Sequence, residues 1–560
     1  MDFSERLPAE TLLGIFRIVR DVFPVPSAKD ISSSFGRKVT QAERTLRLLG
    51  WIPLTHVCAR WRNSALCDAS LWTDVPVVLG EAWMREFLNR SGEMRINIDW
   101  RAWQTQVFSG MVPWDLMQTS VVPQHYKRLR NFEAQLEADD PLFSLLSCTW
   151  PALEHLSLEL TGDFPRYVLL GGDAPCLRYL SFYLESDTAG CDTFPWRAPF
   201  LRTLVVLDIY FHEGIAAASM DEFLNALNAM PHLKHLRLGN GIPSKQASRR
   251  PCPSCSPAAQ VASTKLRTFA LRGCWSMIHH VMEHIHPMPS GRLSIAVQDE
   301  DDVTQADLRS VYARLAAYSQ RDSVPSSGFG AVEVRQSPSD IATIRAFRSS
   351  STLTSTSWRP YPGNWHEGIA GTHPDLDIRL PWSDSLASAL FSSLKDLTPA
   401  GLRVLSLNIP TADDLDRVVH RNIDTAVLRD VSVLQLNGMC GERVSRLLAV
   451  DSDGDAELQT FFPALRLVDV KSSEWQEVLG RSNFVDGRPL ADTLDARLEA
   501  GFAIPAVYVR IKEPVQWLRD DPSSYMYGSA EKVLRQAERL ETTPGVRLIG
   551  EEEIMYDLTL

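Results

Sequence analysis

The chain has 560 residues, of which 44% are hydrophobic and 22% charged, values that exclude a disordered chain and a low-complexity fibre. Its 57 Lys and Arg against 69 Asp and Glu give a formal net charge of −12. Nucleic acid is therefore a poor partner, because binding to phosphates needs clustered cations. The first 80 residues hold ten basic and eight acidic residues, so the remainder carries −14, and we expect separate modules.

The cellular compartment is indicated by three features. The sequence begins MDFSERLPAE, without the basic and apolar regions of a secretory signal. It has nine cysteines, an odd number. No run of consecutive apolar residues approaches the length of about 18 that a membrane-spanning helix needs. We therefore expect reduced thiols, no membrane partner, and a cytoplasmic or nuclear location.

Residues 1–80 predict a small helical module. Apolar residues recur at helical spacing after Pro8, at Leu12, Ile15, Phe16 and Val19. A Pro/Ser-rich stretch over about 24–50 predicts a long loop between helices. A second helical stripe follows, comprising Leu54, Val57, Cys58, Trp61 and Ala65. Periodicity alone is explained by a bundle whose apolar stripes cover each other.

Three motifs in this module are more specific than periodicity. LPAETLLGIF, VCARWR and SLW occur in this order and resemble the opening, middle and closing motifs of the F-box family. Trp51-Ile52 leading into THVCARWR is similar to the F-box-like groups of mushroom-forming fungi. About 35 residues separate Phe16 from Trp51, a longer gap than the compact family pattern has.

The resemblance implies docking on the Skp-type adaptor of a cullin-RING ubiquitin ligase, which is a protein-binding role. Carried over residue by residue, the adaptor-facing positions are Leu7, Pro8, Ile15, Phe16, Val57 and Trp61. Cys58 and Trp72 are equally compatible with internal packing. Trp51, Trp61 and Trp72 are better interpreted as core or interface anchors than as a ligand cage.

Residues 81–145 predict a transition that caps the following region, with a short strand near RINIDW at 95 and a degenerate strand and turn within 128–143. Over 146–300 a Leu-x-x-Leu-x-Leu-like pattern recurs. Its first leucines are 153, 177, 201, 233 and 266, at steps of 24, 24, 32 and 33 residues. This spacing is typical of leucine-rich repeats.

Leucines in such a pattern cannot be buried within one repeat, so neighbouring repeats stack into a continuous core. The predicted fold class is therefore α/β, with the F-box-like module followed by an irregular leucine-rich-repeat solenoid. The steps vary and asparagine ladders are missing, so an ordinary α/β domain with hydrophobic parallel strands remains the alternative.

Two further segments complete the predicted organisation. Residues 301–395 alternate short apolar runs with Ser/Pro/Gly loops and predict divergent repeats or an insertion. Residues 396–560 return to the repeat pattern, with strands expected at GLRVLSLNI, DVSVLQLNG, PALRLVDV and PAVYVRI, followed by a C-terminal cap.

Candidate metal sites are weak. Cys252 and Cys255 form a Cys-x₂-Cys pair, with Cys274 and four histidines (279, 280, 284 and 286) further along. A second Cys-x₂-Cys pair is missing. Asp451 begins an acidic stretch, but glycine and glutamate do not occur at the positions that a calcium loop requires. Residues 299–302 are acidic and predict a solvated turn. We expect neither a metal nor a cofactor.

No nucleophile elbow, Walker loop, dinucleotide-binding or zinc-protease motif occurs in the sequence. We therefore expect a non-catalytic substrate receptor of an SCF-type ubiquitin ligase. It would hold the adaptor, and through it a cullin, at the F-box-like module and a protein substrate at the repeats. The alternative is a protein-interaction scaffold with no ubiquitin-ligase role.

Overall fold

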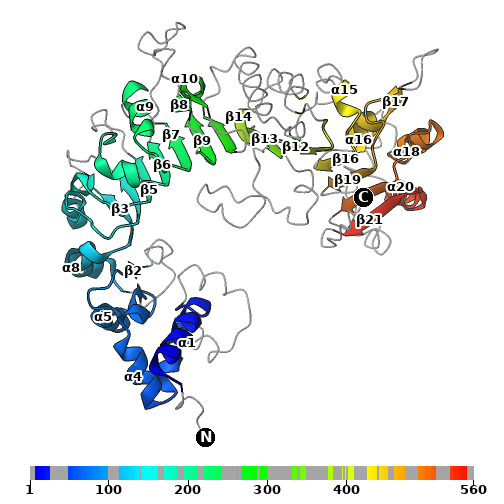
Figure 1. Ribbon diagram of the computed structural model, residues 1–560. Helices are drawn as coiled ribbons and strands as arrows, with labels where there is room; N and C mark the ends of the chain where they lie inside the picture. Colours follow the sequence, from blue (N-terminus) through cyan, green and yellow to red (C-terminus); the bar gives the residue numbers. More distant parts are fainter. Residues whose placement is uncertain are drawn as a thin grey trace. The chain divides into compact units, whose positions relative to one another are not determined.

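A computed structural model describes residues 7–25, 48–98, 112–137, 140–161, 169–185, 194–211, 220–240, 261–262, 266–286, 291–298, 329, 331–336, 341–347, 376–381, 394, 398, 401–408, 425–437, 441–451, 459–472, 490–511 and 530–550. The chain divides into two compact units, Met1–Val261 (unit 1) and Ala262–Leu560 (unit 2). Helices and strands mix in both units and most strands pair in parallel, so the predicted α/β class is confirmed (Figure 1).

Unit 1 begins with a helical module. Its elements are α1 (Ala9–Val22), η2 (Ile52–His56), α4 (Ala59–Cys67), η3 (Ala69–Trp72), β1 (Asp74–Val75), α5 (Glu81–Arg90), β2 (Asn97–Ile98), α7 (Trp114–Leu116), η4 (Met117–Val121), α8 (Val122–His125) and η5 (Tyr126–Arg128). The spacing of the second apolar stripe predicted one helix, and this prediction is wrong. Cys58 is extended, at φ −156° and ψ 169°, and separates the 3₁₀ helix η2 from α4.

A parallel sheet follows in unit 1. Its strands and connecting helices are β3 (Asn131–Glu137), η6 (Pro141–Ser147), β4 (His155–Thr161), η7 (Leu169–Gly172), β5 (Tyr179–Glu185), η8 (Pro199–Thr203), β6 (Val206–Phe211), α9 (Met220–Asn228) and β7 (His235–Gly239). Consecutive strands pair in parallel, each beside the next along the chain. A helix or 3₁₀ turn lies between each pair of strands in the sequence.

The leucines of the repeat pattern form the core of this sheet. Leu156, Leu180, Leu207 and Leu236 stand opposite one another in register and are fully buried. Alternate residues of each strand point to the other face, because side chains alternate along a strand. Each strand thus contributes a short row of apolar side chains to one continuous core.

The third repeat is aligned differently from its prediction. Leu204, rather than Leu201, lies three residues before the strand position occupied by Leu207. Its N–H donates to the carbonyl of Leu201, as the N–H of Leu177 donates to that of Ala174. The equivalent leucines are therefore 153, 177, 204, 233 and 266, and the steps between them, 24, 27, 29 and 33 residues, lengthen steadily.

Unit 2 contains strands and helices, with six described strands, β10 to β15, in succession in its first half. Its elements are β9 (Thr268–Gly273), α10 (Trp275–His284), β10 (Ile285–His286), β11 (Arg292–Val297), β12 (Ala331–Gln336), β13 (Ile341–Phe347), β14 (Leu376–Pro381), β15 (Val404–Asn408), α15 (Thr425–Leu428), β16 (Val433–Asn437), α16 (Gly441–Leu448), β17 (Val450–Asp451), β18 (Gln459–Thr460), β19 (Leu467–Ser472), α18 (Leu490–Glu499), β20 (Ala506–Ile511), α20 (Ala530–Thr542) and β21 (Val546–Gly550). The short strand β8 (Val261–Ala262) spans the boundary between the units.

The middle of the chain departs from simple parallel repeats. β13 pairs antiparallel with both β12 and β14, while β14 pairs parallel with β11 and β12 parallel with β15. Only residues 337–340 separate β12 from β13 in the sequence. Parallel neighbours need a crossover of a dozen or more residues, so this short link requires a reversed strand.

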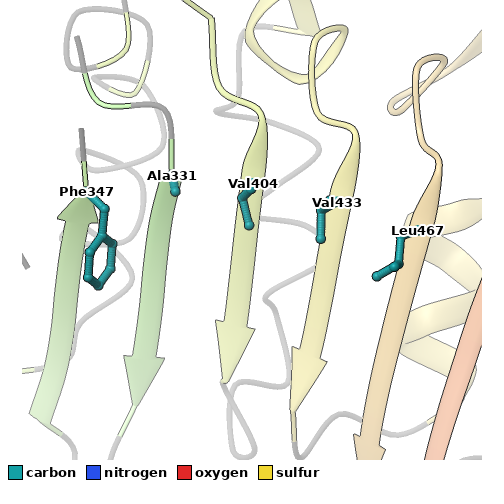
Figure 2. Packing of buried hydrophobic residues seen from close by; sticks show 5 residues of the cluster. All are labelled: Ala331, Phe347, Val404, Val433 and Leu467. Atoms are coloured by element: carbon teal, nitrogen blue, oxygen red, sulfur yellow. The ribbon is translucent and has the colours of Figure 1, made fainter. Parts of the chain in front are cut away.

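One face of the unit 2 sheet carries a buried apolar row. Phe347, Ala331, Val404, Val433 and Leu467 follow one another across neighbouring strands and pack together, as Figure 2 shows. Each is at most 9% exposed, and Tyr508 of β20 packs against the row.

Among the described residues, no helix combines the length and apolar character needed to cross a membrane.

Candidate docking surface

Helix α1 has two different apolar faces. Leu12 and Phe16 are fully buried on one face, whereas Ile18 and Val22 are 66% and 62% exposed on another. Ile15, 38% exposed, lies three residues before Ile18, and residues three or four apart share a helix face. Together with the exposed Phe23 after the helix, they form what we call the α1 apolar surface: Ile15, Ile18, Val22 and Phe23.

The buried face of α1 is held by an aromatic contact with α4. The rings of Phe16 and Trp61 meet edge to face, with centroids 5.3 Å apart. Such pairs add to the stability that comes from burying the rings. At the start of α1, the guanidinium of Arg60 donates a hydrogen bond to the carbonyl of Leu7.

Polar contacts fix the other end of α1 to η3. Arg17 forms an ion pair with Asp68 at 2.9 Å, and Arg20 donates to the carbonyl of Ser70 at 2.7 Å. Asp68 also caps η3 by accepting from the backbone N–H of Ser70. Burial raises the pKa of the Asp68 carboxyl, but the hydrogen bonds with Ser70 and the charge of Arg17 outweigh it, so the pKa lies below 3.8.

The predicted adaptor-facing residues fall into two groups. Pro8, Ile15 and Val57 are exposed, the last of them 59% exposed at the bend before α4. Leu7 is half-buried. Phe16 is fully buried and Trp61 is half-buried against it, so both contribute to packing within the module. Their side chains pack between α1 and α4 and do not belong to the α1 apolar surface.

Sequence reasoning missed Ile18, Val22 and Phe23. Apolar residues in 12–23 cover more of the helix circumference than one packed stripe needs. Leu12, Phe16 and Val19 account for the stripe against the module, which leaves Ile15, Ile18 and Val22 for a second stripe. This excess is the sequence signal for an exposed apolar face.

Two of the tryptophans lie in the core of the module. Trp51 and Trp72 meet edge to face at 5.1 Å, and Trp72 meets Phe87 of α5 at 4.8 Å. The indole N–H of Trp72 donates to the carbonyl of Ala65 at 2.8 Å. This cluster connects η3 and α4 to α5, so the helical module extends beyond the LPAETLLGIF, VCARWR and SLW motifs.

A pocket of about 340 Å³ opens beside this cluster. Its lining includes Trp72, Arg62 and Arg90, with Glu86 and His56. The guanidinium of Arg90 lies over the Trp72 ring at 4.2 Å, and Arg62 donates to the carbonyl of Thr55. Arg90 also forms an ion pair with Glu86 at 2.5 Å, so groups of the chain itself already engage both guanidiniums.

The candidate metal residues are only partly within the described residues. Cys252, Cys255 and residues 299–302 and 452–458 lie outside them. Cys274 and Ser276 are hydrogen-bonded at 3.4 Å, and the rings of His280 and His284 meet edge to face at 5.2 Å. Across the described ranges, no three His, Cys, Asp or Glu side chains are grouped as metal ligands would be.

Comparison with protein-family models gives no match to this chain, and comparison with curated protein sequences gives none either.

Proposed function

We propose that the chain is a non-catalytic substrate receptor of an SCF-type cullin-RING ubiquitin ligase. The N-terminal module, an F-box-like domain, binds a Skp-type adaptor and through it a cullin, and a divergent leucine-rich-repeat solenoid binds the protein substrate. In this role the chain works in the cytoplasm or nucleus. It contributes proximity: substrate lysines gain a high effective concentration near a ubiquitin-loaded enzyme on another subunit.

The observation that carries the proposal is the α1 apolar surface. Three aliphatic side chains and Phe23 are exposed on a helix whose opposite face is packed and ion-paired to α4 and η3. A rigid helix with exposed apolar anchors is suited to helix-face recognition by a partner's groove. It occurs within the segment whose LPAE, VCARWR and SLW motifs resemble the F-box family.

The stacked strands support the second half of the proposal. Within unit 1, leucines at equivalent positions line one core through successive strand and helix repeats, at steps of 24 to 29 residues. Stacked units of this kind present an extended sheet face to protein ligands. The antiparallel strand β13 within unit 2 is an irregularity that such a solenoid accommodates as an insertion.

The test is co-purification of the adaptor with the full-length chain. Ile15→Glu combined with Ile18→Glu places two charges on the α1 apolar surface while leaving Phe16 and Trp61 packed. We expect this variant to lose the adaptor. The matched control is Leu498→Glu, because Leu498 is a 50% exposed apolar residue of α18 in unit 2. The control should retain the adaptor, and equal retention by both variants would remove the ligase proposal.

A further inference from the structure

The pocket beside Trp72 is formed by four elements of the helical module. Its lining comes from η2 (Thr55, His56), α4 (Arg62, Leu66), η3 (Trp72) and α5 (Ala82, Trp83, Glu86, Arg90). Its volume, about 340 Å³, lies at the low end of the range of about 300–1,000 Å³ that is usual for ligand pockets. Trp72 is 1% exposed, so the cavity reaches the core of the module.

The two helices beside the pocket each present one face to it. Arg62 and Leu66 are four residues apart on α4, and Ala82 and Glu86 are four residues apart on α5, so each pair shares a helix face. The ring of Trp72 packs edge to face on Phe87 of α5 at 4.8 Å. This contact fixes α5 against η3, so packed elements bound the cavity.

The polar groups of the lining already have partners in the chain. Arg90 pairs with Glu86, and its guanidinium lies over the Trp72 ring. Arg62 donates to the carbonyl of Thr55. A charged ligand would have to displace these contacts, whereas an uncharged ligand leaves them in place. The lining therefore favours an uncharged, apolar ligand.

The apolar part of the lining is accessible. Trp83 and Leu66 are half-buried, and Ala82 is exposed. The Trp83 ring meets Phe87 edge to face at 6.4 Å, and because Trp83 is only half-buried, part of its ring remains open to a ligand. Aromatic pairs add to the free energy gained by burying the rings. An aromatic ligand therefore gains more here than an aliphatic ligand of equal size.

We propose that this pocket binds an aromatic side chain of a partner protein, which packs against Trp83, Leu66 and Ala82. Aromatic side chains seated in pockets provide much of the affinity of protein interfaces. The site is additional to the α1 apolar surface. Helix α1 packs on α4 through Trp61, and none of the described residues that line the pocket belongs to α1. The inference therefore goes beyond the proposed adaptor docking.

The test uses the full-length chain and blocked peptides with two glycines on each side of a central residue, measured by saturation-transfer NMR. We expect the phenylalanine peptide to bind at least about tenfold more tightly than the alanine peptide, because its ring becomes buried. A cyclohexylalanine peptide keeps the size of the side chain without its aromatic character and should bind about threefold more weakly than the phenylalanine peptide. Equal binding of the phenylalanine peptide and either of the others would overturn the inference.

Filling the pocket should abolish this binding. Ala82→Phe places a ring in the cavity from an exposed position and should weaken binding of the phenylalanine peptide at least about tenfold. The matched control is Ala59→Phe, the same change at an exposed position of α4 outside the pocket. It should bind the peptide like the wild type. Equal losses in the two variants, or no loss in Ala82→Phe, would contradict binding in the pocket.

A spectroscopic measurement places the peptide without blocking the site. In the full-length chain labelled with 5-fluorotryptophan, the fluorine resonance that is missing from Trp83→Leu belongs to Trp83. This resonance should shift in the otherwise unchanged chain as the phenylalanine peptide is added. A Trp83 resonance that does not move while the peptide binds would place the peptide elsewhere and overturn the inference.

The pocket-filling variant also separates this inference from the proposed function. Ala82→Phe leaves the α1 apolar surface intact, so the adaptor should co-purify with it as with the wild type. Loss of the adaptor from this variant would contradict a site separate from the adaptor-docking surface.

Discussion

Phe16 shows how one residue of the LPAETLLGIF motif can serve packing while its neighbours stay exposed. Its ring is fully buried against Trp61, whereas Ile18, two residues later, is largely exposed. Phe16→Ala should lower the stability of the helical module by about 3–5 kcal/mol, because it removes buried area and leaves a cavity. Ile18→Ala should change it by less than about 0.5 kcal/mol. Hydrogen exchange of α1 and α4 in the full chain measures both, and equal effects would contradict the two-faced helix.

The Asp68 carboxylate should make the attachment of η3 to α1 sensitive to acid. Its folded-state pKa lies below the ordinary 3.8, so the ionised carboxylate stabilises the fold above that value. This contribution is lost as the pH falls through the folded pKa. In the wild type the amides of η3 and the end of α1 should keep their protection from pH 6 down to 3.8 and should lose it as the pH falls further. In Asp68→Asn their protection should already be lower at pH 6 and should change less, and parallel profiles would show that another group titrates.

At the scale of elements, Arg497 joins α18 to its neighbours in unit 2. The side chain is 1% exposed, and its guanidinium donates to the carbonyls of Leu448 at 3.1 Å and Phe462 at 2.8 Å and to Thr460. Burial lowers its pKa to about 10, so it stays protonated at neutral pH. One buried cation thus satisfies the carbonyls of Leu448 and Phe462 and the hydroxyl of Thr460.

Arg497→Met should destabilise this part of unit 2 by about 3 kcal/mol or more, because several buried acceptors lose their donor at once. Arg539→Met is the matched control, since Arg539 makes exposed ion pairs with Asp492 and Asp495 worth about 0–1 kcal/mol. Urea unfolding followed by hydrogen exchange in α16 and α18 separates the two. Similar losses would mean that Arg497 is replaceable by apolar packing.

The elements that sequence reasoning predicted are those with strong local signals. The helix after Pro8 and the strands carrying Leu156, Leu180 and Leu236 follow from apolar spacing alone. The third repeat was misaligned by three residues because Leu201 and Leu204 both fit the pattern and both are buried. Only pairing with β5 distinguishes them, and pairing is a long-range property.

The pairing of the reversed strand β13 and of the last strand β21 could not be predicted from apolar spacing either. Both contain short apolar runs whose direction and partners depend on the link to the next strand and on which edge remains open. The candidate site was likewise only half predicted. Spacing placed Ile15 and Val57 in apolar stripes, and only the resemblance of the motifs implied a docking role for them. Deciding that Phe16 faces inward and Ile18 outward required the packing of α1 on α4.

At the scale of the whole molecule, charge distinguishes the N-terminal module from the rest of the chain. The first 80 residues are nearly neutral and carry the α1 apolar surface, while the rest carries a net charge of −14. Apolar docking depends little on salt, because salt screens interactions between charges. Raising NaCl from 50 to 500 mM should therefore leave the adaptor bound to the chain, as measured by co-purification. Release of the adaptor at 500 mM NaCl would contradict docking through the α1 apolar surface.

The most direct test of the receptor proposal is the lifetime of the proteins that co-purify with the chain. Cells expressing the wild type or Ile15→Glu/Ile18→Glu at equal levels are compared by isotope-pulse mass spectrometry. The proposal predicts that proteins bound by both forms live longer in cells with the variant, because they are no longer brought to the ligase. Unchanged lifetimes, with the adaptor lost from the variant, would contradict it and favour a scaffold with no ubiquitin-ligase role.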